Sequence, residues 1–495
     1  MMQMVHTTFH KGITSFWLDR DGLCTGTLIF GVGMRDEPPM LAGITHLVEH
    51  VLLRLVQPVT VLHGGTVTTD SLQLYAVGKP DDVAGFLNAI ADAVSTFQEL
   101  PDEVIALEKS VLEAEDPHKF SNVSSGLLTY RYGTSGVGAA QFGAPATTGL
   151  TKAELIEWAC RWLTAGNAAL TFTGPVPSAL GIRLPAGGPV SHHQDPPLIT
   201  TPTLIKSRKQ GVALSLLVSS QDADLLCEAL RYELLTRLRH AAGIIYSVEN
   251  FTTAIDNDQS QLDLILDPVR QKTIPALKEG INTLRGLVDA GFSENAVQSA
   301  RHALTAELGW DEYVPQDHLD QLAIDALLGR SSRDRQELLD RATAIGSAEL
   351  TKILRTSIGT LIVAFDDSVK LSKADAGSLG LAMDRYEIWQ RTKEPKNRQS
   401  PVEGQPENTW RHKSSPTTLV LTPTHLMSQN SGKTKTISLA DVAVVGDRSC
   451  GCISLMDQRG RSSDLNMDEW KAGKKLRKQL LDAFPPEIIR PFPED

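Results

Sequence analysis

Apolar positions recur at helical or strand spacing along most of the chain, and this periodicity stops in two segments. The first is LPAGGPVSHHQDPPLITTPT, residues 184–203, and the second covers residues 391–418. In both, Pro, Gly and polar residues replace the apolar pattern, which is typical of linkers. The pattern therefore predicts two large units, two linker regions and a small C-terminal unit, with the boundaries 1–185, 186–203, 204–370, 371–417 and 418–495.

The two large units repeat one order of elements. Each opens on an apolar, strand-like run, GTLIFGVGMRDEP (26–38) in the first unit and GVALSLLVSS (211–220) in the second, and a helical segment follows. An alternating strand and further helices come next, and each unit closes on an amphipathic helix that runs into a buried strand. Because strands and helices do not alternate strictly, we expect an α+β fold with two duplicated lobes, each with helices packed on a mostly antiparallel sheet.

The C-terminal unit has a different pattern. Three short strand-like runs, TTLVLTPTHLMSQ, KTISLADVAVVGD and GCISLMDQRGRSSDL, precede the amphipathic helix MDEWKAGKKLRKQLLDAF. Several strands closed by one helix predict a small β-rich domain that resembles a pleckstrin-homology-like barrel. The basic helix is also compatible with binding to a lipid headgroup, although a solvated face is the more common use of such a helix.

Composition narrows the class of protein. The chain has 495 residues, 41% of them hydrophobic and 22% charged, which is typical of a globular protein with several domains. Its net charge of −11 disfavours nucleic acid as a partner, because phosphate binding needs a basic surplus. We find no apolar run of membrane-spanning length and no secretory signal pattern, and five scattered cysteines fit a reducing compartment, so we expect a cytoplasmic protein.

The stretch HLVEH, residues 46–50, carries the first candidate chemistry. On a helix, His46 and His50 lie one turn apart on one face, and Glu49 lies on the same side. A hydrolytic zinc site needs three protein ligands, an open position for water and a carboxylate that accepts a proton. The stretch supplies two ligands and that carboxylate. Chance alone produces this pattern in about one such chain in fifty. A third ligand in a suitable position is therefore needed to support a metal site.

Two glutamates in the helical segment PDEVIALEKSVLEAED are candidates for this third ligand. Glu108 and Glu115 lie seven residues apart, which is two helical turns, and so they share one face. Either carboxylate can point towards the histidine pair. For an arbitrary pair of glutamates, a solvated helix face is the more common outcome. The spacing alone therefore leaves these alternatives open.

Together, GITHLVEHVLLR and EKSVLEAE resemble the pitrilysin/insulinase family of zinc metallopeptidases, the inverzincins, which carry H-x-x-E-H. The resemblance implies a Zn²⁺ site whose ligands are His46, His50 and Glu115. It also implies that Glu49 activates the attacking water and that Glu108 orients the site without binding the metal. Duplicated α+β lobes are a further feature of this family.

A further match lies in RLRHAAGIIYSV, residues 237–248. Members of the family carry an Arg and a Tyr seven residues apart at a helix-to-strand corner of the later lobe, and Arg239 and Tyr246 have this spacing. The resemblance implies that both contact the substrate and stabilise the tetrahedral intermediate, because donors directed at developing charge lower the barrier.

Three features depart from the family pattern or stand outside it. Thr68 stands near the position of an Asn on the family's substrate-binding edge strand, and we assign it to substrate binding. The interval from His50 to Glu115 is shorter than in the family, which alters a helix or loop beside the site. His192 and His193 lie in the first linker, and we interpret them as solvated polar residues.

The resemblance implies a zinc-dependent endopeptidase that hydrolyses short or unfolded peptides, with a role such as peptide or leader-peptide processing. Members of the family enclose peptides in a chamber between two halves of two lobes each, and this chain contains one half. We therefore expect a homodimer, or a heterodimer with a related chain. The alternative is a non-catalytic homologue that acts as a scaffold or partner-binding subunit of a heterodimeric peptidase.

Overall fold

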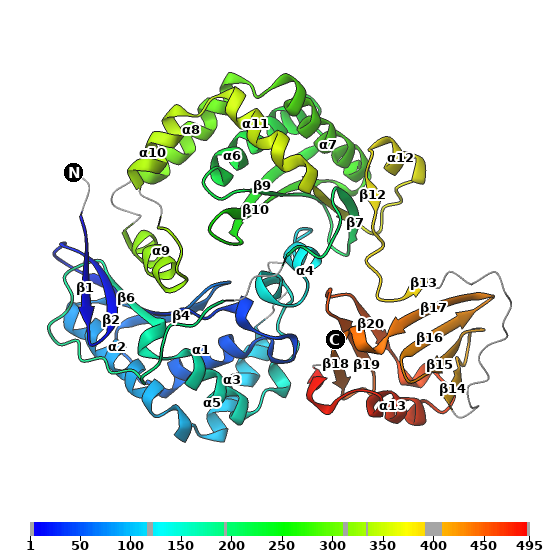
Figure 1. Ribbon diagram of the computed structural model, residues 1–495, viewed down its shortest axis with the longest axis horizontal. Coiled ribbons are helices and arrows are strands. Elements are labelled where there is room, and N and C mark those ends of the chain that lie inside the picture. The colour runs from blue at the N-terminus through cyan, green and yellow to red at the C-terminus, as the bar shows by residue number, and fades with distance from the viewer. Residues whose placement is uncertain are drawn as a thin grey trace.

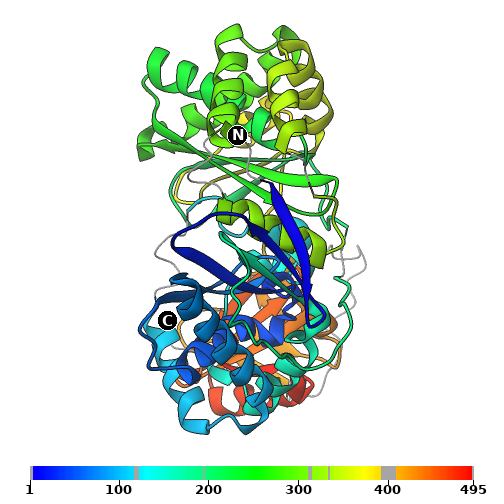
Figure 2. The same ribbon diagram turned by 90° about the vertical axis from the view of Figure 1, so that its left-hand side faces the viewer.

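The computed structural model describes residues 4–115, 122–192, 196–309, 315–332, 335–391 and 408–492. Figure 1 shows two α+β lobes, the N-terminal lobe below and the second lobe above, with a smaller β-rich domain beside them. The sheets of the two lobes face each other and most helices lie on the outer sides, as the turned view also shows (Figure 2). Within these ranges, no helix is both long and apolar enough to cross a membrane.

The first lobe is built on one six-stranded sheet with the strand order β1-β2-β6-β3-β5-β4. Neighbouring strands are antiparallel, except that β2 and β6 are parallel. The strands are β1 Val5–His10, β2 Ile13–Leu18, β3 Cys24–Phe30, β4 Leu62–Val67, β5 Leu72–Gly78 and β6 Ala168–Phe172. The helices on the outer side are α1 Ile44–Leu55, α2 Pro80–Ser95, α3 Asp102–Ala114 and α5 Lys152–Trp162. Apolar residues of the sheet and of these helices form one core.

The second lobe repeats this arrangement. Its strand order is β12-β7-β11-β8-β10-β9, in which β7, β11, β8, β10 and β9 take the places of β2, β6, β3, β5 and β4. The outermost strand differs, because β12 follows β11 in the chain and pairs parallel with β7, whereas β1 precedes β2 and pairs antiparallel with it. The strands are β7 Thr203–Ser207, β8 Val212–Ser219, β9 Ile245–Ala254, β10 Gln259–Pro268, β11 Ile362–Asp366 and β12 Ala382–Met383. The helices are α6 Ala223–Leu234, α7 Thr273–Ala290, α8 Glu294–Gly309, α10 Arg335–Ala344, α11 Ser347–Ser357 and α12 Lys373–Ser378. The predicted α+β fold with two duplicated lobes is therefore confirmed.

One helix from each lobe also packs on the inner face of the other lobe's sheet. Along β8, Val212 belongs to the outer core and Ala213 to an inner cluster, because side chains alternate across a strand. Helix α4 (Leu127–Tyr132), from the N-terminal part of the chain, covers this inner face. Helix α9 (Pro315–Leu327) covers the inner face of the first sheet and packs on Ile29. The sequence pattern did not predict this exchange, because an amphipathic helix does not specify which sheet it covers.

The described residues of the C-terminal domain form two small sheets and the α-helix α13 around a core of their own. The strand orders are β13-β17-β16-β15-β14 and β20-β19-β18-β21. The elements are β13 Gln390–Arg391, β14 Thr409–Arg411, β15 Thr418–Leu421, β16 His425–Asn430, β17 Lys433–Ser438, β18 Val442–Arg448, β19 Ile453–Asp457, β20 Ser462–Leu465, α13 Gly473–Asp482 and β21 Ile489–Phe492. The predicted β-rich domain is present, and β21 pairs with β18 after the helix.

Polar side chains hold the C-terminal domain against the lobes. The Tyr130 hydroxyl donates to Asp384 Oδ2 at 2.7 Å, and Arg459 of the C-terminal domain binds the same oxygen at 3.1 Å. Arg490 forms an ion pair with Glu154 of the first lobe at 2.6 Å. The C-terminal domain is therefore joined by polar contacts to helix α5 of the first lobe and to Asp384, which follows the last strand of the second lobe.

Candidate metal centre

Helix α1 starts where the preceding segment satisfies its first backbone groups. Gly43 has a φ of 96°, a left-handed conformation that glycine adopts without strain. The buried carboxylate of Glu37 accepts hydrogen bonds from the N–H groups of Gly43 at 2.7 Å and Thr45 at 2.9 Å. A helix leaves such N-terminal groups without an internal partner, so Glu37 fixes where α1 begins. Burial raises the pKa of Glu37 to about 7.

The three predicted metal ligands lie together. His46 and His50 are neighbours on α1, with ring centroids 4.8 Å apart. Glu115 follows the last residue of α3, and its Oε2 lies 3.7 Å from His46 Nε2 while its Oε1 lies 3.5 Å from His50 Nε2. One ligand atom from each of the three residues lies within 4.8 Å of the others. Helix α3 packs against α1, and this packing brings Glu115 to the histidines.

Glu108 lies on the other side of the His50 ring. Its Oε2 is 3.2 Å from His50 Nδ1, and its Oε1 accepts a hydrogen bond from Arg54 Nε at 2.6 Å. A buried carboxylate at Nδ1 favours the tautomer that keeps the proton there, and it leaves Nε2 free towards Glu115. Sequence reasoning missed Arg54, although its position four residues after His50 places it on the same face of α1.

Glu49 borders the histidine pair from the buried side of α1. Its Oε2 lies 3.8 Å from His46 Nε2, and its carboxylate packs against Gly65 of β4. Burial and the nearby negative charge of Glu115 raise the pKa of Glu49 to about 7, whereas burial and the neighbouring His50 lower the pKa of His46. A carboxylate that titrates near neutral pH can both accept and return a proton.

The donor set fits a catalytic zinc site better than a structural one. Two imidazole nitrogens and one carboxylate are ligands that Zn²⁺ takes, and three protein ligands leave room for water. The side chains of His46 and Glu115 are 41% and 51% exposed, so the remaining side of the group is open to solvent. Across the described ranges, no other group of three or more His, Cys, Asp or Glu residues has this spacing.

Thr68 lies apart from the metal ligands, directly after β4. Its Oγ1 accepts hydrogen bonds from the N–H groups of Asp70 at 3.2 Å and Ser71 at 3.0 Å. The hydroxyl therefore shapes the tight turn between β4 and β5. Strand β4 is the last strand of the sheet, so its outer edge lacks a neighbouring strand in the described part of the chain.

Arg239 and Tyr246 lie together in the second lobe. Arg239 belongs to the π-helical turn η7 (Leu235–Ala241), and Tyr246 belongs to the edge strand β9. The Arg239 guanidinium lies 5.2 Å from the centre of the Tyr246 ring, and Tyr246 is 72% exposed. The structure thus pairs these two residues with each other, on a different lobe from the three predicted ligands.

The interpretation of His192 as a solvated linker residue is wrong. Its Nδ1 lies 2.7 Å from Asp36 Oδ1, its ring stacks on Trp162, and its side chain is almost entirely buried. The linker passes over the first lobe here, and the Asp36 carboxylate provides a partner for the buried Nδ1 atom. His193 lies outside the described residues.

The chain resembles known proteins in its fold. No protein-family model and no curated protein sequence matches it. An inactive domain of a peptidase M16 from Pseudomonas fluorescens aligns with a TM-score of 0.58 at 15% identity, over 74% of this chain and 100% of that chain. A protease from Helicobacter pylori aligns with a TM-score of 0.60 at 12% identity, over 74% and 99%. The chain shares its fold with peptidase M16 domains.

The periplasmic protease PqqL from Escherichia coli shows how much of a larger relative this fold represents. Its first half aligns with a TM-score of 0.60 at 14% identity, over 77% of this chain and 97% of that chain. Against a longer PqqL structure, the alignment covers 87% of this chain and 55% of that chain. The chain therefore spans about half of that protease.

Proposed function

We propose that the chain is a zinc-dependent endopeptidase that cleaves short or unfolded peptides. The observation that carries this proposal is the arrangement of His46, His50 and Glu115 as one open group of three ligands, with Glu49 beside it and Glu108 behind it. The fold, which is that of proteases from two bacteria, adds support. Each residue type matches a separate requirement of metal-assisted peptide hydrolysis.

In the proposed mechanism, the metal, Glu49 and Glu108 have separate roles. A bound Zn²⁺ supplies Lewis-acid chemistry, because it lowers the pKa of water and polarises a carbonyl. Glu49, whose pKa is about 7, accepts a proton from the water and returns it to the leaving amine. Glu108 holds His50 in one orientation, and Arg54 holds Glu108 in turn.

We propose that the peptide binds along strand β4. Its outer edge, which pairs with no other strand of the described residues, presents backbone N–H and C=O groups, and an extended peptide can pair with them as an additional strand. Because Gly65 carries no side chain, the backbone of β4 lies directly against the Glu49 carboxylate. A peptide added to this edge would pass the catalytic carboxylate. Backbone pairing tolerates many side chains, which suits a peptidase acting on unfolded segments.

A second chain would complete this enzyme. Arg239 and Tyr246 can donate hydrogen bonds to developing negative charge, and the exposed Tyr246 can be reached by another molecule. We therefore propose a homodimer, or a heterodimer with a related chain, in which the two copies enclose the substrate. We place it in the cytoplasm with a role in peptide or leader-peptide processing, since its five cysteines are all free.

The second candidate function is a non-catalytic scaffold or partner-binding subunit of a heterodimeric peptidase. The observation that favours it is that a matching structure is described as an inactive peptidase M16 domain. The three candidate ligands and the adjacent carboxylate are all present here, which favours the enzyme.

Metal analysis combined with a cleavage assay tests the proposal. We expect about one zinc ion per purified chain and cleavage of a quenched peptide library, which should stop after chelation and return when zinc is added. Protein without stoichiometric zinc, or cleavage that survives complete removal of the metal, would contradict the enzyme. Cleavage only after mixing with a related chain would indicate the heterodimeric enzyme if it requires Glu49 and zinc in this chain, and the partner-binding subunit if Glu49→Gln in this chain leaves it unchanged.

Gly65→Ala tests the contact between β4 and Glu49. A Cβ at this position would collide with Glu49 Oε1, so the carboxylate must shift from its place beside His46. We expect kcat/KM for peptide cleavage to fall by roughly tenfold or more, since small displacements of a catalytic group are costly. Gly85→Ala on α2 is the matched control, because a Cβ there meets nothing within 4 Å. Equal activity of both variants would show that Glu49 does not depend on this contact.

A further inference from the structure

Three consecutive charged residues, Arg35, Asp36 and Glu37, are buried at the start of the polar segment before α1. Arg35 is 7% exposed and Glu37 is 5% exposed. Charged side chains are almost never buried without partners, because removing them from water is costly. Each of the three has partners in a different part of the fold: the turn after β4 and the end of β9, the linker between the lobes, and the start of α1, the helix that carries His46 and His50.

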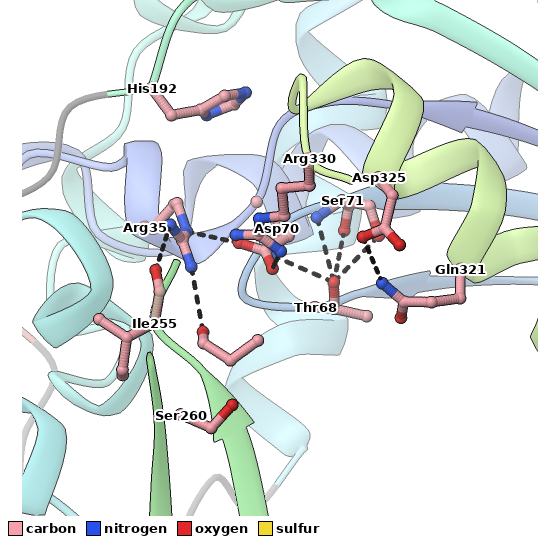
Figure 3. A network of polar contacts seen from close by, with 12 residues as sticks. Arg35, Thr68, Asp70, Ser71, His192, Ile255, Ser260, Gln321, Asp325 and Arg330 are labelled. Atoms are coloured by element: carbon pink, nitrogen blue, oxygen red, sulfur yellow. Dashed lines mark hydrogen bonds and ion pairs between the residues drawn. The ribbon is translucent and has the colours of Figure 1, made fainter. Parts of the chain in front are cut away.

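Arg35 connects the two lobes. Its Nε lies 2.5 Å from Asp70 Oδ1 in the turn between β4 and β5 of the first lobe. Its Nη1 and Nη2 donate to the backbone carbonyls of Ile255 at 3.3 Å and Ala254 at 3.4 Å, where β9 of the second lobe ends. Figure 3 shows the guanidinium between the Asp70 carboxylate and this strand end. One side chain therefore joins the ends of two edge strands.

The turn that carries Asp70 is held from two further directions. The N–H groups of Met34 and Arg35 donate to the carbonyls of Thr68 at 3.0 Å and Thr69 at 3.1 Å. Arg330, which follows α9, donates from Nη1 to Asp70 Oδ2 at 2.8 Å. Asp70 thus lies between two arginines (Figure 3), and the end of β4 is fixed to a segment of the chain that belongs to the second unit.

Asp36 and Glu37 connect the same segment to the linker and to helix α1. Asp36 binds His192 of the linker between the lobes, and its Oδ2 accepts a hydrogen bond from the N–H of Gly33 at 2.9 Å. Glu37 accepts hydrogen bonds from the first turn of α1, one residue before His46. A shift of this short segment would therefore move the strand end, the linker and the metal-binding helix together.

We propose that Arg35, Asp36 and Glu37 form a positioning centre that couples the placement of the second lobe to strand β4 and helix α1. None of the three contacts the candidate ligands directly, so each acts through the element it holds. Arg35 is the inter-lobe member, because its planar fork of donors can bind a carboxylate and two carbonyls at once. The consequence for peptide binding rests on the proposed function, whereas the mechanical coupling does not.

Arg35→Met tests this coupling in the full chain. Asp70 keeps its ion pair with Arg330, so the variant does not leave a buried carboxylate alone. We expect faster amide hydrogen exchange at both strand ends, residues 68–71 and 254–259, measured by mass spectrometry. Because the end of β4 then loses its connection to the second lobe, KM for a peptide should rise by roughly tenfold, kcat should fall by less than this, and zinc affinity should stay unchanged.

Two further variants separate this coupling from a general loss of stability. Arg35→Lys can keep the ion pair with Asp70, but a lysine ammonium lacks the planar set of donors that also reaches the two carbonyls of the second lobe. Amide hydrogen exchange should therefore become faster at residues 254–259 and stay slow at residues 68–71. Arg341→Met removes an arginine that joins Asp222 and Glu349 within the second lobe, and it should leave both strand ends protected.

Unchanged exchange at residues 254–259 in Arg35→Met would overturn the proposed coupling, whatever the activity of the variant. The same holds if Arg341→Met accelerates exchange at both strand ends as strongly as Arg35→Met. If the wild-type chain cleaves no peptide, the proposed function fails instead, and the exchange measurements still decide whether the three residues couple the lobes.

Discussion

Glu49→Gln is expected to lower kcat for peptide cleavage by about 10³-fold, because it removes the group that accepts and returns the proton. Zinc binding should be retained, since Glu49 is not among the three ligands. The variant should also fold. Burial already raises the pKa of Glu49 to about 7, so the pocket accommodates an uncharged side chain of the same shape. Steady-state kinetics and metal analysis on one preparation measure both effects.

Glu113→Gln is the matched control for this variant. Glu113 lies on α3 two residues before Glu115, but its side chain is exposed and contacts Thr148 instead of the ligands. It should cleave peptides like the wild type. If Glu49→Gln also cleaves at the wild-type rate while it binds zinc, Glu49 does not transfer the proton, and the mechanism proposed for this site is wrong.

The second large effect is a loss of zinc affinity, and we expect it to be greater for Glu115→Gln than for Glu108→Gln. Glu115→Gln replaces the anionic ligand, so we expect zinc affinity to fall by more than about 100-fold. Glu108→Gln weakens only the support of the His50 ring, and such outer residues typically contribute about 10- to 100-fold in metal affinity. Competition with a chromophoric chelator at constant pH gives both values.

The order of these two effects is the decisive result. The spacing in the sequence allowed either glutamate to be the ligand, and only the packing of α3 on α1 places Glu115 at both Nε2 atoms. A larger loss for Glu108→Gln than for Glu115→Gln would exchange their roles. Glu113→Gln again serves as the control, because it removes a carboxylate from the same helix without touching the histidines.

The part of the site that lies within one helix could be predicted from the sequence. The spacing of His46, Glu49 and His50 determines that they share one side of α1, because helical geometry is local. Arg54 follows the same rule, and applying it one turn further would have found this residue. By contrast, the pairing of Arg239 with Tyr246 depends on the turn between a helix and a strand, so their spacing alone did not specify the contact.

The contacts of the buried charged segment could not be predicted. In the sequence, Arg35, Asp36 and Glu37 stand near the end of the strand-like run of residues 26–38, and His192 looks like a linker residue. Their partners lie far away along the chain, for example Ile255 for Arg35. Hydrophobic periodicity carries no information about which buried charge meets which carbonyl or carboxylate.

The sequence by itself determined the local elements, the duplication of the lobes and the histidine pair of α1, because hydrophobic periodicity and helical spacing act between near neighbours. Only the tertiary structure decided the exchange of α4 and α9 between the sheets, the approach of Glu115 to both histidines through the packing of α3 on α1, and the bridge from Arg35 to the second lobe. These features are contacts between distant segments. They depend on how whole helices and sheets pack, which the order of residues along one element does not specify.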